Sequence, residues 1–89
     1  MEDKIELLDS KQISLLLNLT LVMKSKHKDL RLGQCLMSTL YDVNPILYTY
    51  ITGTELDPFY NNDRIPEFLT NIADSPVGLM EGYTKLKFS

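Results

Sequence analysis

The side chains that could do chemistry gather in two short motifs. The first is Arg31-Leu32-Gly33-Gln34, and the second is Asp57-Pro58-Phe59-Tyr60, with Asp63 close behind. A guanidinium presents a rigid fork of hydrogen-bond donors that fits a carboxylate. We therefore expect Arg31 and Gln34 to reach Asp57 and Asp63 across the fold.

This expected meeting of the motifs has two interpretations. In the functional one, a small polar pocket for a ligand or for a partner's side chain is lined by Arg31, Gln34, Tyr60 and Asp63. In the structural one, the same contacts form an internal polar staple that fixes how the helix after Arg31 meets the turn at residues 57–63. We favour the staple, because a small domain needs such orienting contacts.

Cys35 and His27 are the only thiol and the only imidazole of the chain. Nucleophilic catalysis requires a base held against the thiol and a third group that orients the base. The two residues are eight positions apart, with a helix start expected between them. We expect Cys35 to be a buried or half-buried small apolar residue. We predict no catalytic residues, no enzymatic activity and no cofactor.

Oxygen atoms that could bind a metal ion cluster at Asp57, Asn61, Asn62 and Asp63. A calcium loop of the EF-hand type would need regularly spaced acids, a glycine and a distal glutamate, and this segment lacks that pattern. Turn and helix-cap chemistry explains the run Asn-Asn-Asp. We predict no metal site.

A basic cluster offers a second kind of binding site. It comprises Lys24, Lys26, His27, Lys28 and Arg31, and it could contact phosphates of a nucleotide or of nucleic acid near a helix start at Asp29. No glycine-rich phosphate loop accompanies the cluster, and the net charge of −3 argues against a nucleic-acid partner. A solvated helix end is the simpler interpretation, and phosphate binding by Lys24, Lys26 and Lys28 is kept as the alternative.

The chain has eight aromatic residues, which is more than a core of this size can hide. Exposed tyrosines are common anchors of protein interfaces. Tyr48 is the best exposed candidate, because it faces away from Tyr50 and Ile46 on its helix. The predicted partner-binding residues are Arg31, Gln34, Tyr48, Asp57, Phe59, Tyr60 and Asp63.

The 89 residues indicate a single domain with a small core. One cysteine excludes an internal disulfide framework, and the acidic start lacks the basic residues of a signal peptide. The longest apolar stretch, residues 13–23, is about half of what a membrane-spanning helix needs. We expect a soluble protein of the cytoplasm.

Capping residues predict four helices. The first runs from Asp9 or Ser10 to about Lys26, with Gln12 completing a capping box, although the alternating leucines leave a strand open for residues 13–23. The second spans Leu30 to about Asp42 behind an Asp29 cap. The third begins at Asn44-Pro45 and stops before Gly53. After a short turn that begins at Asp57-Pro58, the fourth runs from Asp63 to about Ala73.

The apolar spacing predicts the buried faces. The first helix should be buried on more than one face. Because a thin four-helix domain cannot cover so many apolar faces by itself, the pattern is also compatible with a homo-oligomer. We expect the inward face of the second helix to consist of Leu32, Gly33, Leu36, Met37, Leu40 and Tyr41. That of the third should consist of Ile46, Leu47, Tyr50 and Ile51, and that of the fourth of Ile65, Phe68, Leu69 and Ile72. Residues 1–9 form a lead-in, and residues 75–89 form an irregular arm that either packs on the body in an extended form or orders on a partner. The fold class is a compact all-α bundle.

The two motifs, separated by an apolar helix, resemble those of a widespread group of small phage and prophage proteins. Those chains carry a leucine-rich leading helix, an Arg-apolar-Gly-Gln motif that opens the next helix, and an Asp-x-Phe-Tyr motif with a further acid. The similarity covers roughly residues 15–72, and this chain departs from it by the inserted helix at 44–54 and by Ser38 in place of an asparagine. The resemblance implies a phage setting and no established reaction.

Together these patterns predict a non-enzymatic protein that binds a host or phage protein in the bacterial cytoplasm, as an inhibitor or accessory factor. The alternative is a binder of nucleotide or nucleic acid that uses the cluster from Lys24 to Arg31.

Overall fold

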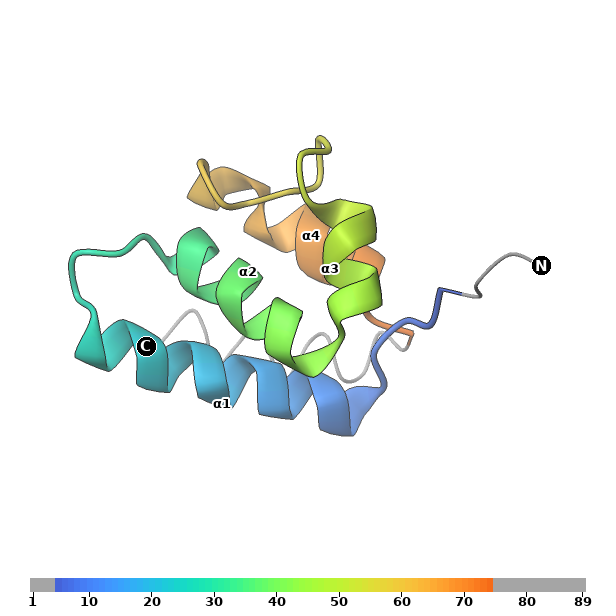
Figure 1. Cartoon of the computed structure of the whole chain (residues 1–89), viewed down its shortest axis with the longest axis horizontal. Coiled ribbons are helices and arrows are strands. Elements are labelled where there is room, and N and C mark those ends of the chain that lie inside the picture. Colours follow the sequence, from blue (N-terminus) through green and yellow to red (C-terminus); the bar gives the residue numbers. More distant parts are fainter. Residues whose placement is uncertain (1–4, 75–89) are drawn as a thin grey trace.

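The computed structural model describes residues 5–74, and their regular elements are helices. In chain order they are α1 (Ser10–Lys26), α2 (Leu32–Val43), α3 (Pro45–Ile51), a short 3-10 helix η1 (Asn62–Arg64) and α4 (Ile65–Ile72) (Figure 1). The predicted all-α fold of four helices is confirmed. The predicted C-terminal arm, residues 75–89, lies outside the described residues.

Helix α1 begins where its capping box predicts. The Asp9 side chain accepts from the Gln12 amide at 2.8 Å, and the Gln12 side chain accepts from the Asp9 amide at 3.1 Å. These bonds satisfy two of the amides that a helix start leaves without partners. The local preference for a helix therefore prevails over the strand alternative for residues 13–23.

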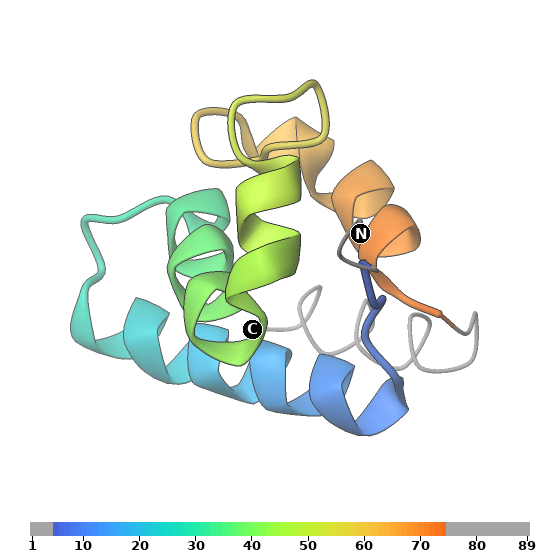
Figure 2. The same ribbon diagram turned by 45° about the vertical axis from the view of Figure 1, so that its right-hand side comes forward.

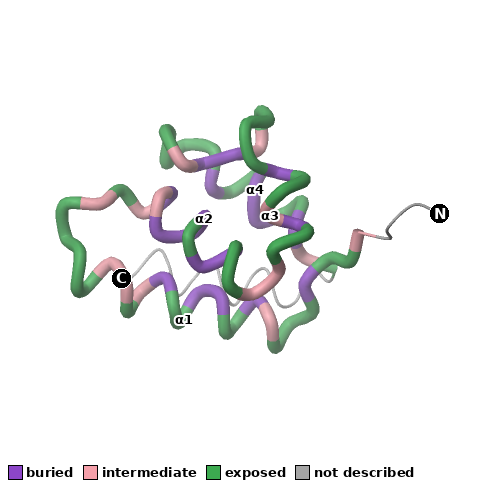
Figure 3. Tube along the Cα trace, viewed as in Figure 1, coloured by how far each residue is buried: buried purple, intermediate pink, exposed green. Residues whose placement is uncertain are grey.

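The burial of α1 differs from the prediction. Only one face is buried, through Ile13, Leu16, Leu17 and Thr20. Leu15, Leu19 and Val22 remain 50%, 37% and 51% exposed. The outer side of α1 is correspondingly exposed in Figure 3. The expectation of burial on several faces is wrong because α2 covers one side of α1 only.

A pair of buried hydroxyls joins α1 to α2. The oxygens of Thr20 and Thr39 lie 2.7 Å apart, and each also lies within 3.0 Å of a backbone carbonyl of its own helix. Since a hydroxyl has one proton, one threonine donates to the other, which in turn donates to a carbonyl. This contact fixes how α1 and α2 sit against each other without an unsatisfied polar group.

Helix α2 begins two residues later than predicted, at Leu32, and Asp29 does not cap it. Instead the Gln34 side chain accepts from the Arg31 amide at 2.8 Å. Leu36, Met37 and Leu40 are buried as predicted, whereas Tyr41 is 56% exposed and does not belong to the inner face.

Helix α3 has the predicted bounds but a different inner face. The Asn44 side chain accepts from the Leu47 amide at 3.1 Å, and Gly53, with φ of 79°, follows the helix end. Leu47 and Ile51 are buried, but Ile46 and Tyr50 are 53% and 62% exposed. The prediction that Ile46 and Tyr50 point inward is wrong.

The last helical segment begins as a 3-10 turn. The Asn61 side chain accepts from the Asp63 amide at 2.9 Å and caps η1, and α4 follows from Ile65. The predicted start at Asp63 is therefore close, but Asn61 is the cap. The predicted buried face of α4 is confirmed: it consists of Ile65, Phe68, Leu69 and Ile72.

Leu8 connects the segment before α1 to the end of α4. Its amide donates to the Ile72 carbonyl at 2.7 Å, and its carbonyl accepts from the Asp74 amide at 2.9 Å. Figure 2 shows this segment running beside the end of α4. The Leu8 side chain is fully buried and belongs to the core, whose other buried members among residues 5–74 are Ile13, Leu16, Leu17, Leu36, Met37, Leu40, Leu47, Ile51, Ile65, Phe68, Leu69 and Ile72.

Candidate protein-binding site

The two sequence motifs do meet, and Gly33 is where they touch most closely. The Gly33 amide donates to the Asn62 side-chain oxygen at 2.9 Å. A Cβ atom at Gly33 would lie only 1.9 Å from the carbonyl oxygen of Pro58. The first turn of α2 therefore packs directly on the backbone of the loop, and this close approach requires a glycine.

Arg31 binds the same loop, but through a carbonyl group. Its Nε and Nη2 atoms donate to the Phe59 carbonyl at 3.4 and 3.2 Å. Its guanidinium carbon lies 6.0 Å from the centre of the Tyr60 ring, at the edge of cation–π range. The expectation that Arg31 reaches Asp57 or Asp63 is wrong, because the loop presents its backbone to α2.

The acidic residues of the loop have other positions. The carboxylate of Asp57, which is largely buried, accepts from the amides of Phe59 and Gly53, each at 2.8 Å. Asp63 is exposed in η1, and its own amide donates to Asn61. Gln34 caps α2, so the structure does not bring Arg31, Gln34, Tyr60 and Asp63 around one polar pocket. The contacts between the motifs are those of a structural staple, made by different atoms from those predicted.

The aromatic residues are distributed differently from the prediction as well. Tyr48 is only partly exposed, packs against the core and meets Tyr41 edge to face at 5.1 Å between ring centres. Tyr60 is 81% exposed and packs edge to face on Phe59, with ring centres 4.8 Å apart. Tyr60 thus stays available to a partner, whereas Tyr48 is not the exposed anchor that the sequence suggested.

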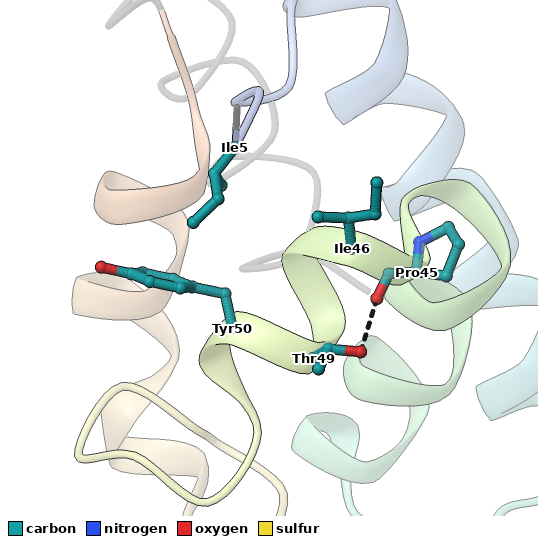
Figure 4. A pocket seen from close by; sticks show the side chains of 5 residues that line it. All are labelled: Ile5, Pro45, Ile46, Thr49 and Tyr50. Carbon is teal, nitrogen blue, oxygen red and sulfur yellow. Dashed lines mark hydrogen bonds between the residues drawn. The ribbon is translucent and has the colours of Figure 1, made fainter. Parts of the chain in front are cut away.

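The outer face of α3 carries an apolar surface that the sequence prediction missed. An open hollow of about 460 Å³ is lined by Ile5, Pro45, Ile46, Thr49 and Tyr50. In Figure 4, the Ile5 side chain points toward the Tyr50 ring, Ile46 lies across from Ile5, and the Thr49 hydroxyl donates a hydrogen bond to the Pro45 carbonyl. The sequence shows the apolar spacing of Ile46 and Tyr50, but this spacing predicts that both side chains lie in the core.

A second hollow, of about 470 Å³, adjoins the first at Tyr50. Its lining consists of Tyr50, Ile51, Thr54, Glu55 and Leu56. Tyr50 therefore stands between two recesses, one apolar and one with a carboxylate at its edge. We call this surface, from Ile5 and Ile46 across Tyr50 to Leu56, the α3 surface. Tyrosine and other aromatic residues are enriched at protein–protein interfaces.

The basic cluster is divided by the fold. The Lys24 ammonium donates to the Lys28 carbonyl at 2.9 Å and to the Leu30 carbonyl, and so holds the loop between α1 and α2. Lys26 and Lys28 are exposed. The start of α2 is also occupied, because Gly33 and Arg31 donate their amides to Asn62 and Gln34. Lys24 is thus engaged by the protein's own backbone, which weakens the case for a phosphate site here.

Cys35 is fully buried in α2. Burial in the apolar interior is the largest influence and raises the pKa of its thiol; the charge of Lys24 partly opposes this shift, and the weaker effect of Asp29 adds to it. Because the thiolate is the reactive form, a raised pKa disfavours reaction.

We therefore expect Cys35 to react with a thiol reagent at neutral pH about a thousandfold more slowly in the folded protein than in denaturant, since reaction requires opening of the fold. Reaction with 5,5′-dithiobis(2-nitrobenzoate), followed by absorbance with and without urea, checks this. A Ser38→Cys variant, at an exposed position of the same helix, is the positive control. Equal rates for the two thiols in folded protein would contradict the burial of Cys35.

Residues 5–74 contain no group of side chains suited to a metal ion and no helix suited to cross a membrane. No three His, Cys, Asp or Glu side chains in this range lie close enough to hold a metal ion. Among the helices of the same range, none has both the length and the apolar character needed to cross a membrane.

Comparison with known proteins gives no relative from which a function could be transferred. No protein-family model, no curated protein and no solved structure matches this chain.

Proposed function

We propose that this chain is a small non-enzymatic binding protein that holds another protein against its α3 surface. The observation that carries the proposal is the exposure of Ile46 and Tyr50, at 53% and 62%, beside an apolar hollow on a helix whose other face is in the core. Exposed apolar side chains that gather around a recess are favourable to bury against a partner.

The chemistry of the surface supports a protein partner. Its side chains offer large apolar area, with the Tyr50 hydroxyl and the Glu55 carboxylate as polar groups at the second recess. Binding of phosphate would call for basic side chains instead, and none of the described residues that line the two recesses is basic. The partner that fits best presents an apolar side chain for the first hollow and a hydrogen-bond donor for the second.

The resemblance of the two motifs to small phage proteins supports a partner in an infected bacterium. On that basis we propose a phage or host protein of the bacterial cytoplasm as the partner, and a role as an inhibitor or accessory factor. The Arg31 side chain and the loop at residues 57–63 form a second exposed contact for such a partner, since Tyr60 is 81% exposed.

The test is affinity capture from bacterial lysate with tagged wild-type protein and with Tyr50→Ala. We expect wild type to retain a specific protein and Tyr50→Ala to bind it about tenfold or more weakly, as truncation of a central aromatic anchor does. The affinity for the purified partner is measured by isothermal titration calorimetry. Tyr41→Ala is the matched control, because Tyr41 is also a helical tyrosine that is more than half exposed, on α2.

Two results would contradict the proposal. If wild type and Tyr50→Ala retain the same protein with equal affinity, the partner does not bind at the α3 surface. Retention of nucleic acid or nucleotide that is released by moderate salt and lost with Lys26→Glu and Lys28→Glu would instead establish phosphate binding by the basic cluster.

A further inference from the structure

The outer side of α1 carries an apolar stripe that nothing in the described part of the fold covers. Leu15, Leu19 and Val22 are 50%, 37% and 51% exposed. Their spacing of four and then three residues places them in one row along the helix. This is the spacing with which one helix packs against another. The α1 stripe, as we call these residues, is on a different helix from the α3 surface.

The stripe is paired with a recess on the same side of the molecule. A hollow of about 240 Å³ is lined by Leu19, Val22 and Met23 of α1, by Thr39 and Asp42 of α2, and at its end by Lys26 and His27. Leu15 lies outside this hollow. It precedes Val22 by seven residues, which is roughly 10 Å along a helix. The same face thus has a projecting leucine near one end and a recess near the other.

We propose that the α1 stripe binds a second copy of this chain, with the two α1 helices antiparallel. A two-fold axis near Leu19 would put Leu15 of each copy against the recess of the other. One projection and one recess on a single face are what an isologous interface requires, because both are then used twice and the assembly closes as a dimer.

Charge favours this occupant and this direction. Glu6 and Asp9 are exposed just before α1, and Lys26 and Lys28 are exposed at and after its end. Lys11 in the first turn and Asp29 after the last reduce this polarity but do not reverse it. In an antiparallel pair, the acidic end of each α1 lies near the basic end of the other, whereas a parallel pair would bring like charges together. Antiparallel helices also oppose their dipoles favourably.

The dimer is expected to be weak. Stable interfaces bury about 800 Å² on each partner, and a row of half-exposed aliphatic side chains supplies only part of that area. We expect a dissociation constant in the micromolar range, so that monomer and dimer exchange as the protein is diluted.

The first test is sedimentation equilibrium of the full chain over a concentration series. Wild type is expected to change from monomer to dimer, and Val22→Glu to remain monomeric, because the dimer would bury the new charge. Ser14→Glu is the matched control, since it adds the same charge at an exposed position of α1 outside the stripe. Far-UV circular dichroism of both variants checks that the fold is kept.

Every outcome decides the proposal. A dimer that Val22→Glu abolishes and Ser14→Glu preserves supports it. Wild type that stays monomeric up to the millimolar range, a dimer that survives Val22→Glu, or equal loss in both variants would overturn it. Growth beyond a dimer would overturn the closed symmetry.

The second test concerns the direction of pairing. Leu15→Cys and Val22→Cys variants are mixed and oxidised, and the disulfides are identified by mass spectrometry. The antiparallel arrangement predicts that the mixed disulfide exceeds either disulfide between identical variants. The native thiol does not compete, because Cys35 is fully buried. An excess of the disulfides between identical variants would overturn the antiparallel arrangement.

Discussion

Replacement of Gly33 by alanine is expected to destabilise the protein by about 3 kcal/mol, the upper end of the range for overpacking. The new Cβ would lie 1.9 Å from the carbonyl oxygen of Pro58 and 2.8 Å from its carbonyl carbon. Both are backbone atoms, so relief requires the whole loop to move away from α2. Such a movement would also break the bond from the Gly33 amide to Asn62.

The sign of this effect separates tertiary packing from local preference. Within an isolated helix, alanine is about 1 kcal/mol more favourable than glycine. Urea denaturation of Gly33→Ala, beside Ser38→Ala at an exposed position of the same helix, measures the difference. Ser38→Ala should leave the free energy of unfolding unchanged or slightly raised. A Gly33→Ala variant as stable as wild type would show that the loop does not pack on α2 as described.

The helix boundaries were largely predictable because capping is local chemistry. Asp9 with Gln12, and Asn44 with Pro45, carry all the information that their helix starts need. The start of α2 was misplaced because Asp29 is also a good cap by type. The signal that could have corrected it is Gln34, three residues after Arg31, in the position from which a glutamine reaches back to the capping amide.

The burial of α3 could not be predicted in the same way. A helix of seven residues makes barely two turns, and either Leu47 with Ile51 or Ile46 with Tyr50 supplies an apolar row at the right spacing. Which row faces the core depends on how α2 and α3 are joined, and that is a tertiary property. The sequence therefore shows that these residues are apolar, but it does not show that Ile46 and Tyr50 form an exposed surface.

The sequence predicts which two segments the structural staple joins, but not which atoms make the contacts. Arg31 and the loop at residues 57–63 do meet, as their side-chain types indicated. However, Gly33 lets the loop backbone approach so closely that carbonyl groups, and not carboxylates, face α2. Asp57 instead satisfies two amides within its own turn, which is common chemistry for aspartate.

Leu8→Ala is expected to cost about 3 kcal/mol, as truncation of a fully buried leucine does. The side chain is 0% exposed, although it lies in the segment that the sequence suggested was only a lead-in. The sequence feature that indicates burial of Leu8 is its position immediately before the Asp9 cap. An apolar residue there often packs against one at the fourth helical position, which is Ile13 here. Leu7→Ala is the control, because Leu7 is its neighbour and is 43% exposed.

The loss of stability in Leu8→Ala should also be detectable locally, where the segment before α1 meets the end of α4. The Leu8 backbone accepts from Asp74 and donates to Ile72, so it holds the end of α4 to the start of α1. Hydrogen exchange by nuclear magnetic resonance should show faster exchange at the amides of Leu8 and Asp74 in Leu8→Ala. If the contact between α1 and α4 opens separately, the amides in the middle of α2 will keep more protection than the amides of Leu8 and Asp74.

The other outcomes also have a clear meaning. Equal loss of protection throughout would mean that Leu8 stabilises one cooperative unit, because a domain with so small a core has little stability to divide. Unchanged exchange at both amides, with unchanged urea denaturation, would show that Leu8 does not join the core.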